Sequence, residues 1–88
     1  MHPDCRARVA YFNRGAAYER KGNYDRAIQD FDESIHLKPD DPDAFNSRCW
    51  TRAVANKALE AALADCNESL RLRPADANTL GSRGFVYF

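Results

Sequence analysis

Three cysteines are the residues of this chain best suited to chemistry, because a thiolate can attack a substrate, bind a metal or form a disulfide. They are Cys5, Cys49 and Cys66. An odd number of cysteines without CxxC spacing predicts reduced thiols rather than a disulfide framework. A zinc site needs four ligands at short spacing, and His2 and His36 are far apart in the sequence and expected on the surface. We therefore expect neither a metal nor a cofactor.

The serine, aspartate and histidine residues offer no catalytic arrangement. They are scattered along the chain, without a glycine-rich phosphate loop and without the Gly-x-Ser-x-Gly motif that exposes a nucleophilic serine. Covalent catalysis needs a nucleophile, a base and a group that orients the base. The sequence predicts a protein that is not an enzyme and has no catalytic residues.

Charge and hydropathy narrow the class of function. The 13 basic residues balance the 13 acidic ones, so no net field would hold the chain on nucleic acid or on an anionic membrane. No apolar run approaches the roughly 20 residues of a membrane span, and residues 1–4 lack the basic and apolar regions of a signal peptide. We expect a cytoplasmic protein that recognises its partner through local contacts.

The elements that position these residues follow from an internal repeat. Segments 30–39 and 65–74 share Asp, Glu, Ser, Leu and Pro at matching places, and Arg14, Arg48 and Arg83 recur at spacings of 34 and 35 residues within similar motifs. Self-similarity at this period is typical of stacked helical hairpins, in which each repeat buries its apolar face against its neighbours.

The predicted fold is therefore all-α. Apolar and small residues recur at i, i+4, i+7 and i+8 in the second helix of each repeat, which is the spacing of one buried stripe. Asp41 is placed as a helix N-cap, as is Asp4, and Pro42 as a first helical residue. Helices are expected at about 4–20, 24–37, 42–55 and 59–72, with a fifth from about 77. They form a single domain over residues 1–88, with repeats at about 8–41 and 42–76 and the first helix of a third at about 77–88.

The first repeat resembles the tetratricopeptide repeat family, and with the second and the partial third it makes about two and a half repeats. The resemblance is carried by Arg14-Gly15-Ala16-Ala17-Tyr18, Gly22-Asn23-Tyr24, Ala27, Phe31 and Pro39. The second repeat departs from the pattern at Cys49, Arg52, Lys57 and Cys66, which stand for a small glycine, a tyrosine, the turn glycine and an aromatic residue. The resemblance implies a right-handed superhelix of antiparallel hairpins. It also places Cys49 and Cys66 between the helices of one hairpin, where they are expected to be small core residues.

The resemblance further implies a concave groove, lined by the first helices, that holds a partner peptide or helix. Three aromatic residues would then recur along one side and clamp an apolar segment, since buried aromatic anchors supply much of the energy of an interface. Alternatively, these residues pack against one another or in an oligomer. The predicted groove residues are Phe12, Asn13, Ala16, Asn46, Trp50 and Phe85, and the rest of the lining is Val9, Glu19, Arg20, Asp43, Ser47, Ala53, Val54, Asn78, Gly81, Ser82 and Phe88.

A second hypothesis is self-assembly through the last predicted helix. Its apolar residues would face water without a following helix, so end-to-end docking of copies would cover them. The predicted oligomer interface consists of Leu80, Phe85, Tyr87 and Phe88.

Two specialised forms of binding are disfavoured. Some members of the family bind a chaperone's C-terminal carboxylate through Lys, Asn and Arg residues; Asn13 resembles one of these, but Asp43 stands where a lysine is needed and would repel the ligand. Helical repeats that read RNA usually present a basic face, which the neutral charge balance argues against. A protein or peptide partner, and not nucleic acid, is expected.

Recurring charges predict ion pairs between repeats. Arg48 is expected to reach Asp30, and Arg83 to reach Asp65, so that the pairs set the register of the stack. The alternative is that these charges are solvated independently, since an exposed pair contributes only about 0–1 kcal/mol.

Overall fold

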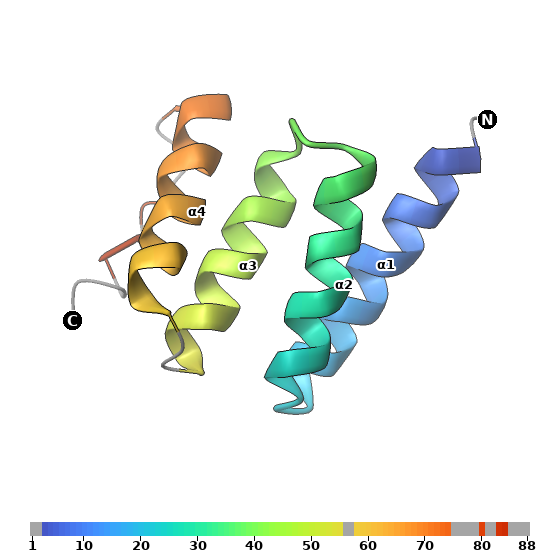
Figure 1. Ribbon diagram of the computed structural model, residues 1–88, viewed down its shortest axis with the longest axis horizontal. Helices are drawn as coiled ribbons and strands as arrows, with labels where there is room; N and C mark the ends of the chain where they lie inside the picture. The colour runs from blue at the N-terminus through green and yellow to red at the C-terminus, as the bar shows by residue number, and fades with distance from the viewer. Residues whose placement is uncertain (1–2, 56–57, 75–79, 81–82, 85–88) are drawn as a thin grey trace.

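The computed structural model describes residues 3–55, 58–74, 80 and 83–84. Within these residues the chain forms helices and no strand, which confirms the all-α prediction there. The four helices are α1 (Pro3–Arg20), α2 (Tyr24–Leu37), α3 (Pro42–Val54) and α4 (Leu59–Leu72). Figure 1 shows them side by side, with α1 partly behind α2 and with α3 between α2 and α4. They form two hairpins, α1–α2 and α3–α4, joined by the packing of α2 on α3.

The fifth predicted helix falls largely on residues outside the described part. Leu80, Arg83 and Gly84 are described and helical, and Leu80 is exposed. The fifth helix and the superhelix of the whole chain therefore stay predictions.

The helix ends follow local sequence signals, with one exception. The Asp41 side chain accepts a hydrogen bond from the Asp43 N–H at 3.1 Å, which confirms the predicted cap of α3. At the end of α2, the Lys38 N–H donates to the Ser34 carbonyl at 3.0 Å, directly before a proline that cannot continue the helix. The helix α1 begins at Pro3, so Asp4 lies inside the helix and not at the predicted cap position. A proline in the first turn suits a helix start, since its missing N–H has no partner there in any case.

The turn within each hairpin contains a residue with a left-handed backbone conformation, but the residue type differs between the two turns. In the first hairpin, Gly22 takes a left-handed conformation with φ +82°, which glycine adopts without steric cost. In the second hairpin the left-handed residue is Ala58, with φ +51°, directly before α4. A residue with a Cβ is strained in this region. The turn of the second hairpin is therefore a weaker local structure than that of the first.

The first hairpin is closed by a glycine against a phenylalanine ring. A Cβ added at Gly15 would lie 2.9 Å from the Phe31 ring and 3.2 Å from the Ala27 carbonyl oxygen, so no larger residue fits without a shift. Ala27 and Phe31 are buried. The close approach of α1 and α2 thus depends on small residues that face an aromatic one.

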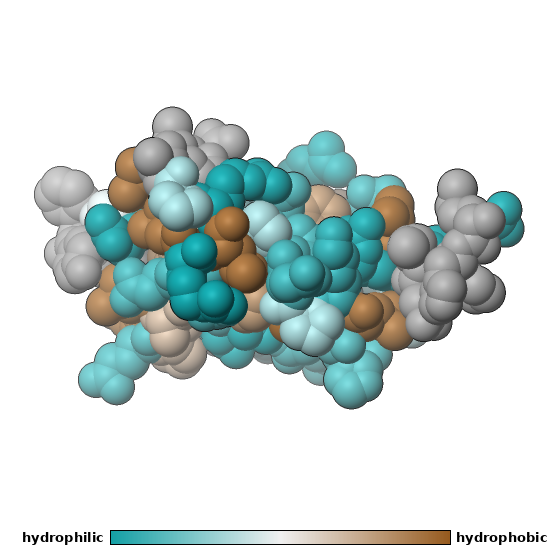
Figure 2. Space-filling view, turned by 90° about the horizontal axis from the view of Figure 1, so that it is seen from above, coloured by the Kyte–Doolittle hydropathy of each residue, from teal (hydrophilic) through white to brown (hydrophobic). Residues whose placement is uncertain are grey.

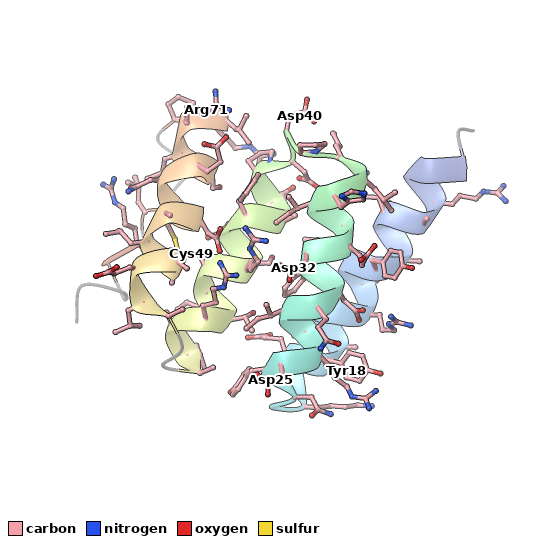
Figure 3. The ribbon with its side chains drawn as sticks, viewed as in Figure 1. Tyr18, Asp25, Asp32, Asp40, Cys49 and Arg71 are labelled. Carbon is pink, nitrogen blue, oxygen red and sulfur yellow. A yellow bond between two sulfur atoms is a disulfide. The ribbon has the colours of Figure 1, made fainter. Side chains whose placement is uncertain are left out.

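The second hairpin replaces this contact with a covalent bond. Cys49 on α3 and Cys66 on α4 form a disulfide with a Cα–Cα distance of 5.4 Å, and both are fully buried beside Ala62. Figure 3 shows it between the two helices, next to the label of Cys49. The expected core position of both residues is confirmed, whereas the prediction of reduced thiols is wrong. Two cysteines that the sequence separates by 17 residues face each other because the hairpin folds one helix back along the other.

The two hairpins also share a polar contact at the same place. The Ser34 hydroxyl on α2 donates to the Arg8 carbonyl at 3.3 Å, and the Ser69 hydroxyl on α4 donates to the Pro42 carbonyl at 2.8 Å. Each serine is buried and ties its helix to the first turns of the preceding one. Carbonyl groups inside a helix already accept helical hydrogen bonds, so the effect of these bonds is to satisfy the buried serine hydroxyls. The repeat in the sequence is therefore a repeat of contacts.

The disulfide removes one argument for the predicted cytoplasmic location of the protein. Disulfides persist in oxidising compartments and are rare in the reducing cytosol, so the cysteines no longer support a cytoplasmic protein. No helix in the described part of the chain is both long and apolar enough to cross a membrane. The cytoplasmic location stays a prediction.

Candidate partner-binding groove

A hollow of about 280 Å³ lies where the two first helices, α1 and α3, face each other. Its walls come from both hairpins, so the hollow exists only when the hairpins are stacked. Apolar, amide, hydroxyl and carboxylate groups all contribute to it. The lining residues are Ala16, Glu19, Phe31, Asn46, Ser47, Trp50 and Thr51.

Trp50 and Glu19 form the polar bridge across the hollow. The indole Nε1 of Trp50 on α3 donates a hydrogen bond to Glu19 Oε1 on α1 at 3.1 Å. Trp50 is 38 % exposed, which makes it one of the exposed large hydrophobic residues of the described part. An exposed aromatic residue held in one orientation is a typical anchor for a partner, because little rotamer freedom is left to lose on binding.

Asn46 adds a buried acceptor to the same lining. Its Oδ1 atom is buried and accepts no hydrogen bond from any residue that the structure describes. Most buried polar atoms in proteins have a partner, so an exception indicates a ligand or water site, or strain. Thr51, by contrast, is satisfied within α3, because its hydroxyl donates to the Ser47 carbonyl at 2.8 Å.

The structure brings together part of the predicted groove. Ala16, Asn46 and Trp50 line the hollow, as do Glu19 and Ser47 from the wider lining. Phe12 instead packs on Phe31, with ring centroids 5.6 Å apart. Asn13 is exposed but does not line the hollow, and Ala53 is buried. Of the third aromatic position and the oligomer interface, Phe85, Tyr87 and Phe88 lie outside the described residues.

Two lining residues, Phe31 and Thr51, were not predicted. Phe31 belongs to α2, a second helix, and reaches the hollow past Gly15, which has no side chain to block it. The signal that could have found it is the pairing of a glycine on one helix with a buried aromatic residue on the next. Thr51 follows Trp50 directly and lines the hollow with a buried side chain.

Polar contacts between the hairpins hold the two walls in place. Arg8 on α1 donates from Nη1 to Asp41 Oδ2 at 2.9 Å, so the helix that forms one wall is tied to the cap of the helix that forms the other. Arg48 on α3 donates from Nη1 to Asp32 Oδ1 on α2 at 2.6 Å. Figure 3 labels Asp32 on the side of α2 that faces α3. These contacts tie α3 and its cap to both helices of the first hairpin.

The predicted pairing of arginines with aspartates is wrong in its partners. Arg14 forms two hydrogen bonds to Asp30, at 2.8 and 2.7 Å, and Arg48 forms two to Asp65, at 2.9 and 2.7 Å. Each pair lies within its own hairpin, α1–α2 or α3–α4, and neither pair joins the two repeats. The reason is that position 14 on α1 faces position 30 on α2 once the hairpin closes.

In the contact between repeats, each arginine faces the residue that stands two positions after the predicted aspartate. Arg48 reaches Asp32, and at the equivalent place Arg83 lies 3.5 Å from the Oδ1 atom of Asn67 instead of binding Asp65. Asp65 is already bound by Arg48 and by Arg52, the latter at 2.7 Å. Both of its oxygens thus accept hydrogen bonds from α3, three in all.

These ion pairs shift the ionisation of their arginines. The hydrogen bond and the charge of Asp30 raise the pKa of Arg14 above its ordinary value. Burial opposes the charge of Arg48, but the hydrogen bonds and charges of Asp65 and Asp32 outweigh it, so the pKa of Arg48 is also raised. Both guanidinium groups stay charged at every ordinary pH, and the pairs act as fixed supports rather than as switches.

The negative charge of Asp43 is compensated by an arginine. It is exposed near the start of α3, where its Oδ1 accepts a hydrogen bond at 2.8 Å from Nη1 of Arg73, the residue that follows α4. It is not among the residues that line the hollow.

The comparison with known proteins identifies the first hairpin. The family model described as tetratricopeptide repeat matches residues 9–41. Residues 9–41 are a tetratricopeptide repeat. The resemblance drawn from the sequence is confirmed over this segment, and no curated protein matches the chain. Tetratricopeptide repeats are generally protein–protein interaction modules on a non-enzymatic scaffold fold.

The second hairpin repeats the geometry of this tetratricopeptide repeat with different side chains. Its Arg–Asp pair, its serine bond and its buried alanine on α4 stand at the places of their counterparts in the first hairpin. Cys49 and Cys66 take the places of Gly15 and Phe31. Among the residues that the structure describes, no group of three or more His, Cys, Asp or Glu side chains is arranged to hold a metal ion.

Proposed function

We propose that the chain is a non-enzymatic binding module that holds a peptide or helix of another protein in the groove between α1 and α3. The observation that carries this proposal is the half-exposed Trp50, fixed by Glu19 at the side of a hollow that both hairpins form. The first repeat belongs to a family of interaction modules, which supports the same reading.

The mechanism is recognition of an extended or helical segment along the first helices. An aromatic anchor in a partly enclosed site excludes water from its contacts, and such residues carry most of the energy of an interface. Ion pairs tie the two hairpins together and the disulfide fixes α3 on α4, so little ordering is needed on binding. Rigid sites bind more tightly for the same contact area.

The test is truncation of the anchor. Peptides selected from a displayed random library are labelled, and their affinities are compared for the wild type and Trp50→Ala by fluorescence anisotropy. We expect the variant to lose about 1–3 kcal/mol of binding free energy with an unchanged helical circular dichroism spectrum. Leu59→Ala is the matched control, because Leu59 is an exposed apolar residue of α4 that does not line the hollow.

Unchanged affinity in a folded Trp50→Ala variant would exclude this site. Loss of the folded state would show that Trp50 is part of the core, and the packing hypothesis for the aromatic residues would replace the groove.

Self-assembly through residues 80–88 stays the alternative function. Leu80 is 42 % exposed, and the other members of that predicted interface lie outside the described residues. Light scattering at increasing protein concentration tests it. An oligomer that the Phe85→Ser, Phe88→Ser double variant returns to monomer would support self-assembly.

A further inference from the structure

In the hollow, the Glu19 carboxylate is bound by the N–H of an indole and not by a cation of the described residues. Glu19 accepts the Trp50 N–H, which is a neutral donor and orients the carboxylate without cancelling its charge. The ion pairs found within residues 3–55 and 58–74 use other acidic residues, namely Asp30, Asp32, Asp41, Asp43, Asp65 and Glu68. Glu19 is therefore an acidic group that these pairs leave uncompensated, at a site where water is partly excluded.

The rest of the lining suits a long side chain with a polar head. Ala16, Phe31 and the indole of Trp50 provide apolar walls, and Asn46 Oδ1 provides a second oxygen that receives no hydrogen bond from the described residues. Lysine and arginine carry an aliphatic stem and a head that only donates hydrogen bonds. The hollow, at about 280 Å³, is small for a drug-sized ligand.

We propose that this hollow selects a cationic side chain, lysine or arginine, from the partner segment. The stem packs on Ala16 and Phe31, and the head donates to the carboxylate of Glu19 and to Asn46 Oδ1. The inference rests on the proposed function, since it names the chemistry of the segment that the groove binds.

Asp43, an acidic residue near the start of α3, is paired with Arg73 and does not line the hollow. A metal ion fits less well than an organic cation, because hard metal ions take six or more oxygen ligands and the described residues hold no group of three acidic or metal-binding side chains. On the face of the molecule in Figure 2, hydrophobic residues form small groups separated by hydrophilic ones. Specificity on such a surface comes from individual polar contacts.

The test compares four pools of short, capped random peptides that differ in one central residue, which is lysine, arginine, norleucine or glutamate. Norleucine keeps the lysine stem without the ammonium group. Binding to the 88-residue chain is followed by the fluorescence of Trp50, its single tryptophan, and by calorimetry. We expect the lysine and arginine pools to bind about tenfold more tightly than the norleucine pool, and the glutamate pool to bind least.

Glu19→Gln is the decisive variant, because its amide oxygen can still accept the Trp50 N–H while the charge is gone. We expect it to reduce the preference for cationic pools to about twofold or less. Glu33→Gln is the matched control, since Glu33 is exposed on α2 and does not line this hollow; it should keep the full preference.

The outcomes separate the two proposals. Binding of all pools with equal affinity, or a cationic preference that survives Glu19→Gln, overturns cation selection but leaves the groove as a binding site. Absence of binding for every pool overturns the proposed function and this inference together.

Discussion

The Cys49–Cys66 disulfide gives a prediction whose size can be worked out from the structure. It joins α3 to α4 across 17 residues of sequence. In the chain-entropy model, a cross-link that closes a loop of this length removes about 10 cal/mol/K from the unfolded state, which corresponds to about 3 kcal/mol at 25 °C. Small domains have total stabilities of about 5–15 kcal/mol. Reduction should therefore remove a large share of the stability of the chain.

The assay is thermal and urea unfolding with and without a phosphine reductant, followed by helical circular dichroism and by Trp50 fluorescence. We expect reduction to lower the melting temperature by about 12–24 °C, since 1 kcal/mol shifts a domain of this size by about 4–8 °C. The Cys49→Ala, Cys66→Ala double variant should be insensitive to the reductant, and Cys5→Ser should respond like the wild type.

Thiol counting gives the result that would refute the reasoning. Alkylation of the denatured, unreduced protein should modify one cysteine, Cys5, because the other two are bonded to each other. Modification of all three cysteines would show that the disulfide does not form. A melting temperature that reduction leaves unchanged would show that the cross-link adds nothing to the packing of α3 on α4.

Two further predictions concern the packing and the turns. Ala27→Leu and Ala62→Leu each insert methylene groups at fully buried positions between helices, so each should lower the free energy of unfolding by about 1–3 kcal/mol; melts within a degree or two of the wild type would show that the helix pairing is wrong. Ala58→Gly should raise stability by about 1 kcal/mol, because glycine relieves the left-handed strain at φ +51°. Gly22→Ala should lower stability by a similar amount for the same reason, and effects of the opposite sign in urea unfolding would contradict this account.

Local signals in the sequence determined the helices and their ends. The apolar stripe of each second helix, the Asp41 cap and the prolines after Leu37 and Leu72 act within one or two turns of the chain. Such signals can be read without knowledge of the fold. The groove residues Ala16, Asn46 and Trp50 were predicted from the family resemblance and not from periodicity.

The choice of partners between side chains was decided by the tertiary structure. Arg48 lies within reach of Asp32 and Asp65, and not of the predicted Asp30, because that choice depends on the rotation and separation of three packed helices. Cys49 and Cys66 bond because two backbones meet with their Cβ atoms opposed, a condition that disulfide geometry requires and that sequence spacing does not reveal. Phe31 enters the groove from a second helix for a similar reason. Periodicity gives the face on which a residue lies, whereas a contact also needs the distance and angle between helices, and these arise only when the whole chain packs.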